Sequence, residues 1–178
     1  MTHEIIMAGF GGQGVMAMGK ILAEAALREG KNVSWLPSYG PEMRGGTANC
    51  NVIVSEEPVG APIVTEASAA LVLNRPSLDK FEKDVVPGGT LIINSSLIDK
   101  KATREDIKVY YVPANEIANE IGTGKIANMV MLGAYLAASG AAKQDTVMEV
   151  VSEIFSGKKA DVIPLNKEAL TRGAACIK

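Results

Sequence analysis

Glu4-Ile-Ile-Met-Ala-Gly-Phe-Gly-Gly-Gln-Gly14 is the stretch of sequence that decides the fold. Its first residues form a short apolar run that ends at glycines, which is typical of a buried parallel strand. Gly9, Gly11 and Gly14 then have the GxGxxG spacing, and the apolar residues of 15–29 recur at helical spacing. Glycines between a strand and a helix let backbone N–H groups approach a phosphate. This stretch therefore predicts an anion-binding loop in an α/β fold.

The alternation of strands and helices continues through the rest of the chain. Apolar or alternating runs predict strands at 4–8, 32–36, 47–55, 69–74, 90–94 and 108–112. Helical spacing predicts helices at 15–29, 78–83, 115–121, 126–139, 144–155 and 166–177. This order predicts an α/β protein: a three-layer α/β/α sandwich with a Rossmann-like, mostly parallel sheet and a helical C-terminal part. The 178 residues contain no internal repeat and no low-complexity linker, so we expect one domain over residues 1–178.

Composition and charge exclude several classes of protein. Lys and Arg number 18, Asp and Glu number 20, the net charge is −2, and aromatic residues are only 4%. Such a chain lacks the basic surface and the stacking aromatics that bind nucleic acid or an anionic membrane. The longest uncharged run, 126–142, is shorter than the roughly 20 residues that span a bilayer, and Glu4 precedes any apolar run of a secretory signal. We therefore expect a cytoplasmic protein with no nucleic-acid partner and no membrane partner.

The few cysteines and histidines exclude common kinds of metal and nucleophilic chemistry. Cys50 and Cys176 lie far apart and form no CxxC pair, and His3 is the only histidine. An iron–sulfur site, a zinc site and a His-based catalytic triad are therefore not predicted. We interpret both cysteines as small buried hydrophobes in a reduced compartment. The sequence predicts no catalytic residue and no metal ligand.

A second glycine-rich loop, Ser38-Tyr-Gly-Pro-Glu-Met-Arg-Gly-Gly46, follows the second predicted strand. Ligands of a doubly wound sheet bind outside the carboxyl ends of the strands, so we expect this loop beside the first one. It carries the phenol of Tyr39, the carboxylate of Glu42 and the guanidinium of Arg44, which suits phosphate. Lys20, in the first predicted helix, adds a second positive charge. The alternative is an exposed turn whose charges are only solvated.

A dinucleotide site makes a further demand that this sequence does not meet. It needs an acidic residue at the end of the second strand to hold the ribose hydroxyls. Here the strand ends Val33-Ser-Trp-Leu-Pro37, and the next acidic residue is Glu42. This weighs against NAD. An NADP site that uses Ser38 and Arg44 stays an alternative, and so does a tight turn with no ligand.

Three motifs together resemble one family. The glycine loop with the following Ile21-Leu-Ala-Glu-Ala-Ala26, the loop 38–46, and Asn128-Met-Val-Met-Leu-Gly-Ala134 are similar to the gamma subunits, or gamma domains, of 2-oxoacid:ferredoxin oxidoreductases. The resemblance extends from about Ile5 to the last predicted helix. The two loops together are specific, whereas either one alone would be a weak signal.

The resemblance implies a subunit of an enzyme that oxidatively decarboxylates a 2-oxoacid to acyl-coenzyme A and CO2 and reduces ferredoxin. In this family, thiamine diphosphate is held between alpha and beta subunits. Iron–sulfur clusters belong to the beta subunit and to a ferredoxin-like delta subunit, and the gamma subunit is an α/β/α domain packed beside them. The form of the second loop resembles the 2-oxoglutarate and branched-chain groups more than the pyruvate group.

The resemblance also assigns a coenzyme A site to the two loops. Carried over by motif and loop chemistry, the cofactor-binding candidates are Gly11, Gly12, Gln13, Gly14, Lys20, Tyr39, Arg44, Gly45 and Gly46. Coenzyme A carries a pyrophosphate and a 3′-phosphate, which suit helix N–H groups, lysine and arginine. The chain has neither a cysteine quartet for a cluster nor a Gly-Asp-Gly motif for thiamine diphosphate. Alone, it is therefore expected to bind neither of those groups and to be inactive.

Three functions stay open at this point. The first is a non-catalytic subunit of a 2-oxoacid:ferredoxin oxidoreductase that contacts coenzyme A. The second is a stand-alone NADP-binding oxidoreductase domain. The third is an assembly module whose glycine loop contacts a neighbouring chain and no ligand. An indolepyruvate enzyme, whose smaller subunit has a similar domain, is a variant of the first.

Overall fold

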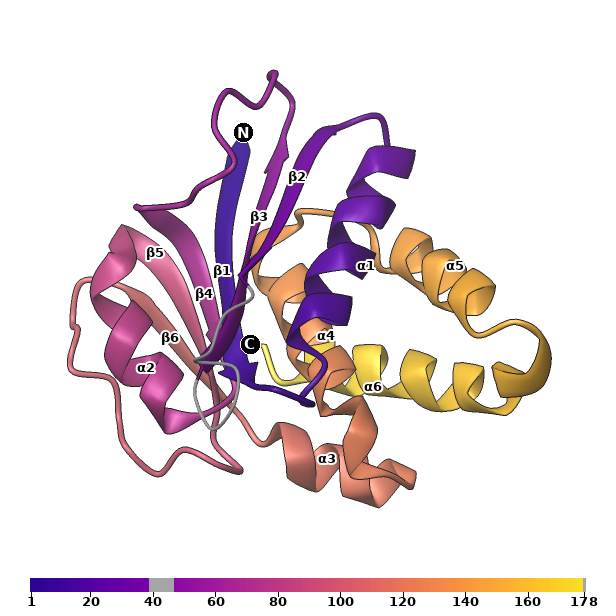
Figure 1. The fold of residues 1–178 in the computed structure, drawn as a ribbon. Coiled ribbons are helices and arrows are strands. Elements are labelled where there is room, and N and C mark those ends of the chain that lie inside the picture. The colour runs from indigo at the N-terminus through magenta and orange to yellow at the C-terminus, as the bar shows by residue number, and fades with distance from the viewer. Residues whose placement is uncertain (39–46, 178) are drawn as a thin grey trace.

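One six-stranded sheet forms the centre of the molecule (Figure 1). The computed structural model describes residues 1–38 and 47–177, without the side chains of Thr47 and Lys158. In this part of the chain the strands are β1 (Thr2–Phe10), β2 (Asn32–Ser38), β3 (Thr47–Ser55), β4 (Ala67–Val72), β5 (Val85–Asn94) and β6 (Lys108–Val112). Their spatial order is β2-β3-β1-β4-β5-β6. Only β3 runs antiparallel to its neighbours, so the mostly parallel sheet is confirmed.

Helices cover both faces of this sheet. The described residues form α1 (Val15–Arg28), α2 (Arg75–Phe81), α3 (Ala114–Ile121), α4 (Ala127–Ser139), α5 (Gln144–Ile154) and α6 (Ile163–Ala175). Short 3-10 turns occupy Glu82–Asp84, Gly124–Ile126 and Gly157–Val162. Figure 1 shows α1, α4, α5 and α6 on one side of the sheet and α2 on the other. The predicted α/β/α layering and the helical C-terminal part are therefore confirmed.

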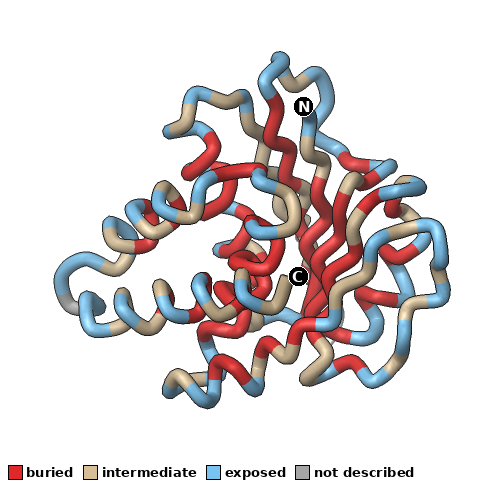
Figure 2. The backbone as a smooth tube through the Cα atoms, turned by 180° about the vertical axis from the view of Figure 1, so that it is seen from behind, coloured by how far each residue is buried: buried red, intermediate tan, exposed pale blue. Residues whose placement is uncertain are grey.

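The strand β1 divides its side chains between two cores. Ile5 and Met7 pack with α1 and the C-terminal helices, whereas Ile6 and Ala8 face a smaller core beneath α2. All four are at most 2% exposed, as a parallel strand covered on both faces requires. Seen from behind, the buried strands run between exposed outer segments (Figure 2). Burial on both faces holds the carboxyl end of β1 in place, and with it the start of the loop that follows.

The uncharged run at 126–142 contains the buried helix α4, as its pattern predicts. Every residue from Ala127 to Leu136 is buried. Two glycines let α4 and α6 come together: the backbone of Leu170 stands where a Cβ on Gly133 would be, and the backbone of Val130 stands where a Cβ on Gly173 would be.

In the described part of the chain, no helix is long and apolar enough to cross a membrane.

Several predicted boundaries are wrong because the elements start earlier than their apolar patterns indicate. The helix predicted at 78–83 is α2, which begins at Arg75 because Asn74 accepts a hydrogen bond from the Ser77 N–H (2.9 Å) and Pro76 fits the first turn. The strand predicted at 69–74 therefore ends at Val72. The last helix likewise starts before residue 166, with a proline in its first turn. The strand predicted at 90–94 begins five residues earlier, at the start of β5.

The position of β3, between β1 and β2, brings the glycine loop and the strand ends that flank 39–46 to one edge of the sheet. Phe10 at the end of β1 lies opposite Thr47, and Ser38 at the end of β2 lies opposite Asn49. The carboxyl ends of β1 and β2 therefore lie at the same edge of the sheet, on either side of the start of β3. The strands that flank 39–46 therefore end at the edge that holds the glycine loop, while the predicted second loop itself lies outside the described residues.

Candidate functional site

The glycine loop occupies the turn between β1 and α1, at the carboxyl edge of the sheet. Gly12 and Gly14 have φ angles of +90° and +76°, which L side chains rarely adopt. A Cβ atom at Gly12 would meet no atom of the described residues within 4 Å, so these residues leave the backbone there open. A cavity of about 290 Å³ lies over the loop and is lined by Phe10, Gly11, Gly12, Gly14, Val15, Met16, Ala17 and Ala48.

The N-terminus of α1 points its free backbone groups at this loop. Gly14 is the N-cap residue, and no side chain among the described residues caps the helix. The first turn of α1 also contains no acidic residue. The first N–H groups and the positive end of the helix dipole are therefore available to an external anion such as a phosphate.

Gln13 shapes the loop from inside. Its Oε1 accepts a hydrogen bond from the Phe10 N–H at 2.5 Å, and its own N–H donates to the Phe10 carbonyl at 3.2 Å. A Cβ on Gly9 would lie 2.5 Å from the same Oε1, so only glycine leaves room for this contact. The side chain that the sequence assigned to a cofactor thus holds the turn closed.

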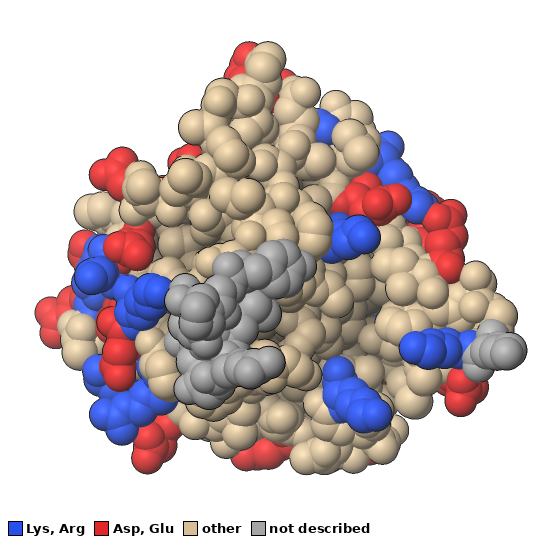
Figure 3. Space-filling view, viewed as in Figure 1, with Lys and Arg blue, Asp and Glu red and all other residues tan. Residues whose placement is uncertain are grey.

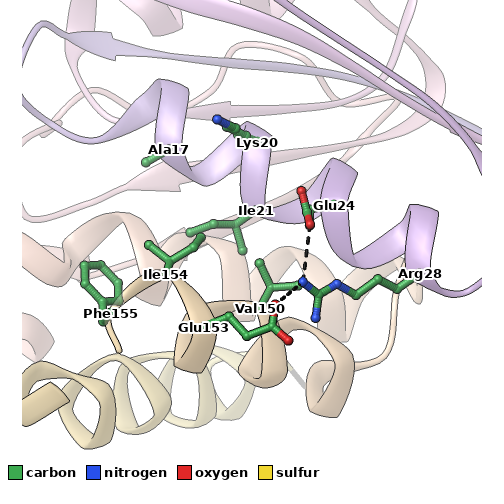
Figure 4. A pocket seen from close by; sticks show the side chains of 9 residues that line it. All are labelled: Ala17, Lys20, Ile21, Glu24, Arg28, Val150, Glu153, Ile154 and Phe155. Atoms are coloured by element: carbon green, nitrogen blue, oxygen red, sulfur yellow. Dashed lines mark hydrogen bonds and ion pairs between the residues drawn. The ribbon is translucent and has the colours of Figure 1, made fainter. Parts of the chain in front are cut away.

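Lys20 lies on α1, outside the loop. Its Nζ is 5.8 Å from the centroid of the Trp35 ring on β2. It stands at the rim of a groove of about 430 Å³ between α1 and α5 (Figure 4). The helix rises by about 9 Å from Gly14 to Lys20, so one ligand contacts both only if it extends along α1.

The groove has apolar walls and an ion pair at its far end. Ile21, Val150 and Ile154 project into it, and Arg28 donates to Glu24 at 3.3 Å and to Glu153 (Figure 4). The Arg28 guanidinium lowers the pKa of the Glu153 carboxyl by this hydrogen bond. One guanidinium faces two carboxylates, so this end of the groove keeps a net negative charge, whereas Lys20 stands at the end nearer the loop.

A second hollow, of about 580 Å³, adjoins the groove between α1, α4 and α6. The two share Ala17, Ile21 and Phe155. Lys125 and Lys159 also line the second hollow. Figure 3 shows basic groups around a depression of uncharged surface on this face. The surface next to the glycine loop is thus concave and largely apolar, with lysines around it.

Four of the predicted site residues lie outside the described residues: Tyr39, Arg44, Gly45 and Gly46. The strand ends on either side of them are described. Ser38 ends β2, and Thr47 begins β3 opposite Phe10 of the glycine loop. The structure therefore brings one end of this segment, Thr47, beside the loop that holds Gly11, Gly12, Gln13 and Gly14. Ser38 lies one strand farther away, and Lys20 lies farther along α1.

The cysteines and the histidine take no part in this site. Cys50 is buried beneath α1 and donates to the Val15 carbonyl at 3.7 Å; burial raises the pKa of its thiol to about 12. Its interpretation as a buried hydrophobe is confirmed, but Cys176 is only half-buried. His3, near the amino end of β1, has its pKa lowered chiefly by burial. In the described ranges, no group of three metal-ligating side chains gathers.

Asn128 is the site residue that sequence reasoning missed. Its Nδ2 donates to the carbonyl of Gly14 at 3.1 Å. The motif 128–134 contains it and is the signal that was present in the sequence. A motif does not show which backbone group its side chain contacts, because the partner here lies 114 residues away.

Comparison with known proteins gives the family. An α/β domain with a glycine loop at the carboxyl edge of its sheet is the class that the fold and the site define. The sequence matches the family described as pyruvate ferredoxin/flavodoxin oxidoreductase over residues 4–176, and the chain belongs to that family. The resemblance expected from the three motifs is thereby confirmed.

Individual relatives make the comparison more specific. The keto/oxoacid ferredoxin oxidoreductase gamma subunit from Geobacter sulfurreducens PCA is 31% identical with a TM-score of 0.84, over 98% of this chain and 97% of that one. The 2-oxoglutarate:ferredoxin oxidoreductase from Magnetococcus marinus, solved with 2-oxoglutarate, coenzyme A and succinyl-CoA bound, is 26% identical with a TM-score of 0.89, over 98% of this chain and 31% of that one.

A longer relative shows the same domain within a larger chain. The ketoisovalerate oxidoreductase subunit VorA of Methanothermobacter marburgensis is 43% identical over 172 residues, which are 96% of this chain and 36% of that one. The chain therefore spans about a third of the length of VorA, but nearly all of the Geobacter gamma subunit.

Proposed function

We propose that this chain is the gamma subunit of a multi-subunit 2-oxoacid:ferredoxin oxidoreductase and contributes to its coenzyme A site. The enzyme converts a 2-oxoacid, coenzyme A and oxidised ferredoxin into acyl-coenzyme A, CO2 and reduced ferredoxin. The observation that carries the proposal is the glycine loop, whose open backbone at Gly12 adjoins an uncapped helix N-terminus. That arrangement suits the phosphates of coenzyme A. A relative solved with coenzyme A bound has the same fold.

The substrate is proposed to be 2-oxoglutarate or a branched-chain 2-oxoacid. Support comes from the relatives, one named for ketoisovalerate and one solved with 2-oxoglutarate. The described residues of the glycine loop offer no further selection, because their backbone groups recognise an anion and not the side chain of a 2-oxoacid. The choice of 2-oxoacid is therefore assigned to the partner subunits.

The chemistry of decarboxylation and electron transfer is also assigned to partners. Two distant cysteines do not hold an iron–sulfur cluster, and no thiamine diphosphate motif is present. We propose alpha and beta subunits for thiamine diphosphate and a ferredoxin-like delta subunit for clusters, with ferredoxin as the acceptor. This chain supplies N–H groups that bind and orient coenzyme A, and it is inactive alone.

The NADP-binding alternative has no support in the fold. In a Rossmann fold, the ribose is held at the end of the strand next to the glycine-loop strand. Here β3 separates β1 from β2, so Ser38 ends a strand that is not adjacent to Phe10. The assembly module stays as the competing function that an experiment must separate from coenzyme A binding.

The first experiment is purification of the tagged chain from its host without oxygen. We expect co-elution of a thiamine-enzyme chain and a cysteine-rich chain in a brown fraction that reduces a viologen with a 2-oxoacid and coenzyme A. A colourless protein that elutes alone contradicts the subunit proposal.

The second experiment compares two glycine substitutions in the purified complex. Gly12→Asp places a carboxylate at the proposed phosphate site, and Gly88→Asp is its control, because Gly88 also has a positive φ, +80°, and open space around it. We expect Gly12→Asp to raise the KM for coenzyme A about tenfold or more with an unchanged KM for the 2-oxoacid. If Gly12→Asp reduces assembly but the complex that remains has an unchanged KM for coenzyme A, the assembly module is favoured.

A further inference from the structure

The side chain of Asn128 joins the C-terminal helices to the glycine loop. Asn128 is in the first turn of α4 and is 8% exposed. Its Nδ2 donates to the Gly14 carbonyl at 3.1 Å, and its Oδ1 accepts from the Met129 N–H at 2.9 Å. One amide group therefore bridges the start of α4 and the residue at which the loop becomes α1.

The carbonyl that Asn128 contacts also starts α1. The Met18 N–H donates to the same Gly14 oxygen at 3.0 Å, which is the first hydrogen bond of the helix. A Cβ on Gly14 would collide with Asn128 Nδ2, and Gly14 has a positive φ. Glycine at 14 and asparagine at 128 are therefore matched to one another, and together they fix where the first N–H groups of α1 point.

The position of Asn128 is fixed in turn by the packing of α4. The backbone of α6 touches α4 at Gly133 and at Gly173, where neither glycine leaves room for a side chain. A helix held this closely has little freedom to shift, because packed backbones do not yield as flexible side chains do. The C-terminal helices thus form a rigid support for the amide at 128.

We propose that Asn128 is a positioning residue for coenzyme A: it holds Gly14 so that the N-terminus of α1 keeps its anion-binding geometry. This inference rests on the proposed coenzyme A role of the glycine loop. Asn128 need not touch the ligand. It acts through the Gly14 carbonyl, and it makes the shape of the loop depend on the C-terminal layer of the fold.

The test uses the isosteric substitution Asn128→Asp in the purified complex. Aspartate keeps the acceptor for the Met129 N–H but replaces the donor to Gly14 with an oxygen. Asn166→Asp is the matched control, because Asn166 is also buried, at 4% exposed, and donates its Nδ2 to a carbonyl, that of Val162 in its own helical segment, at 2.8 Å. Both substitutions remove one buried amide donor, but only the first removes a contact with the loop.

Two measurements are made on each variant. We expect Asn128→Asp to raise the KM for coenzyme A about tenfold while the KM for the 2-oxoacid stays unchanged. We also expect faster amide hydrogen exchange, by mass spectrometry, in peptides that cover residues 9–18. Asn166→Asp is expected to change neither. Should Asn128→Asp not yield a folded complex, Asn128→Ala is measured in the same two assays.

The outcomes separate this inference from the proposed function. Unchanged exchange over residues 9–18 in the Asn128 variant overturns the positioning role. The positioning role is also overturned if the Asn128 variant leaves the KM for coenzyme A unchanged while Gly12→Asp raises it. The proposed function then stands. If neither Gly12→Asp nor Asn128→Asp changes the constant, the coenzyme A site itself is wrong.

Discussion

The backbone of Leu170 on α6 occupies the place where a Cβ atom on Gly133 of α4 would stand. Both helices belong to the layer that packs on the sheet beside α1. A methyl group at 133 therefore meets main-chain atoms, which give way only if a helix moves.

Gly133→Ala is accordingly expected to destabilise the chain. Forcing an extra methyl into a close-packed interface costs about 1–3 kcal/mol in the free energy of unfolding, and a backbone neighbour places this site at the upper end. Urea unfolding followed by circular dichroism measures the loss. Gly60→Ala is the control, because a Cβ there meets no atom within 4 Å, and it is expected to be neutral or slightly stabilising. Equal stability of Gly133→Ala and the native chain contradicts the packing argument.

The N-cap of α2 supports a second prediction. Asn74 Oδ1 accepts from the Ser77 N–H at 2.9 Å, whereas its Nδ2 has no partner among the described residues. Asn74→Ala removes the cap and is expected to lower the free energy of unfolding by about 1 kcal/mol. Asn74→Ser keeps an acceptor oxygen, so its loss is expected to be smaller. Equal losses in the two variants, measured by urea unfolding, mean that the cap does not contribute.

The strand, glycine loop and first helix could be predicted from sequence because their signals are local. The apolar run, the glycine spacing and the helical period all lie within residues 4–29. The place of β3 between β1 and β2 was not predictable in the same way. Strand order depends on pairing between distant residues, such as Phe10 with Thr47, and alternation within one strand does not encode its neighbour.

The candidate site was likewise predictable only where its signals are local in the sequence. Gly14 was identified by the GxGxxG spacing and Gly12 by the family resemblance, and their positive φ angles give the reason for glycine. The contact from Asn128 to Gly14 was not identified, because the two are far apart in sequence and meet only when α4 packs beside α1. Lys20 fits the loop chemistry in the sequence, yet the helical rise places it at the rim of the groove between α1 and α5.

Burial of Cys50 gives a prediction about pH. Its pKa is raised from the ordinary value of 9.0 to about 12 because the thiolate is disfavoured in the apolar core. Below pH 9 both folded and unfolded states keep the proton. Between pH 9 and 12 only the unfolded state releases it, so the native fold loses stability by about 1.4 kcal/mol per pH unit from this group.

Cys50→Ala removes that titration. We expect the free energy of unfolding of the native chain to fall, relative to that of the variant, as the pH rises from 8 to 10.5. Urea unfolding of both proteins at each pH measures the difference, and other groups cancel because the two chains share them. Parallel pH profiles for the two proteins would show that the thiol titrates normally.

Lys20 supports the last prediction, on ligand affinity. It stands at the end of the groove nearer the loop, where the phosphates of an extended coenzyme A would meet a positive charge. Lys20→Ala in the complex is expected to raise the KM for coenzyme A several-fold at low salt, and the effect is expected to shrink as salt screens the exposed charge. Lys80→Ala is the control, because Lys80 makes a similar contact with an aromatic ring, 5.3 Å from the centroid of Phe81, on the opposite face of the sheet. A Lys20→Ala complex with unchanged coenzyme A kinetics but weakened assembly assigns the groove to a partner subunit instead.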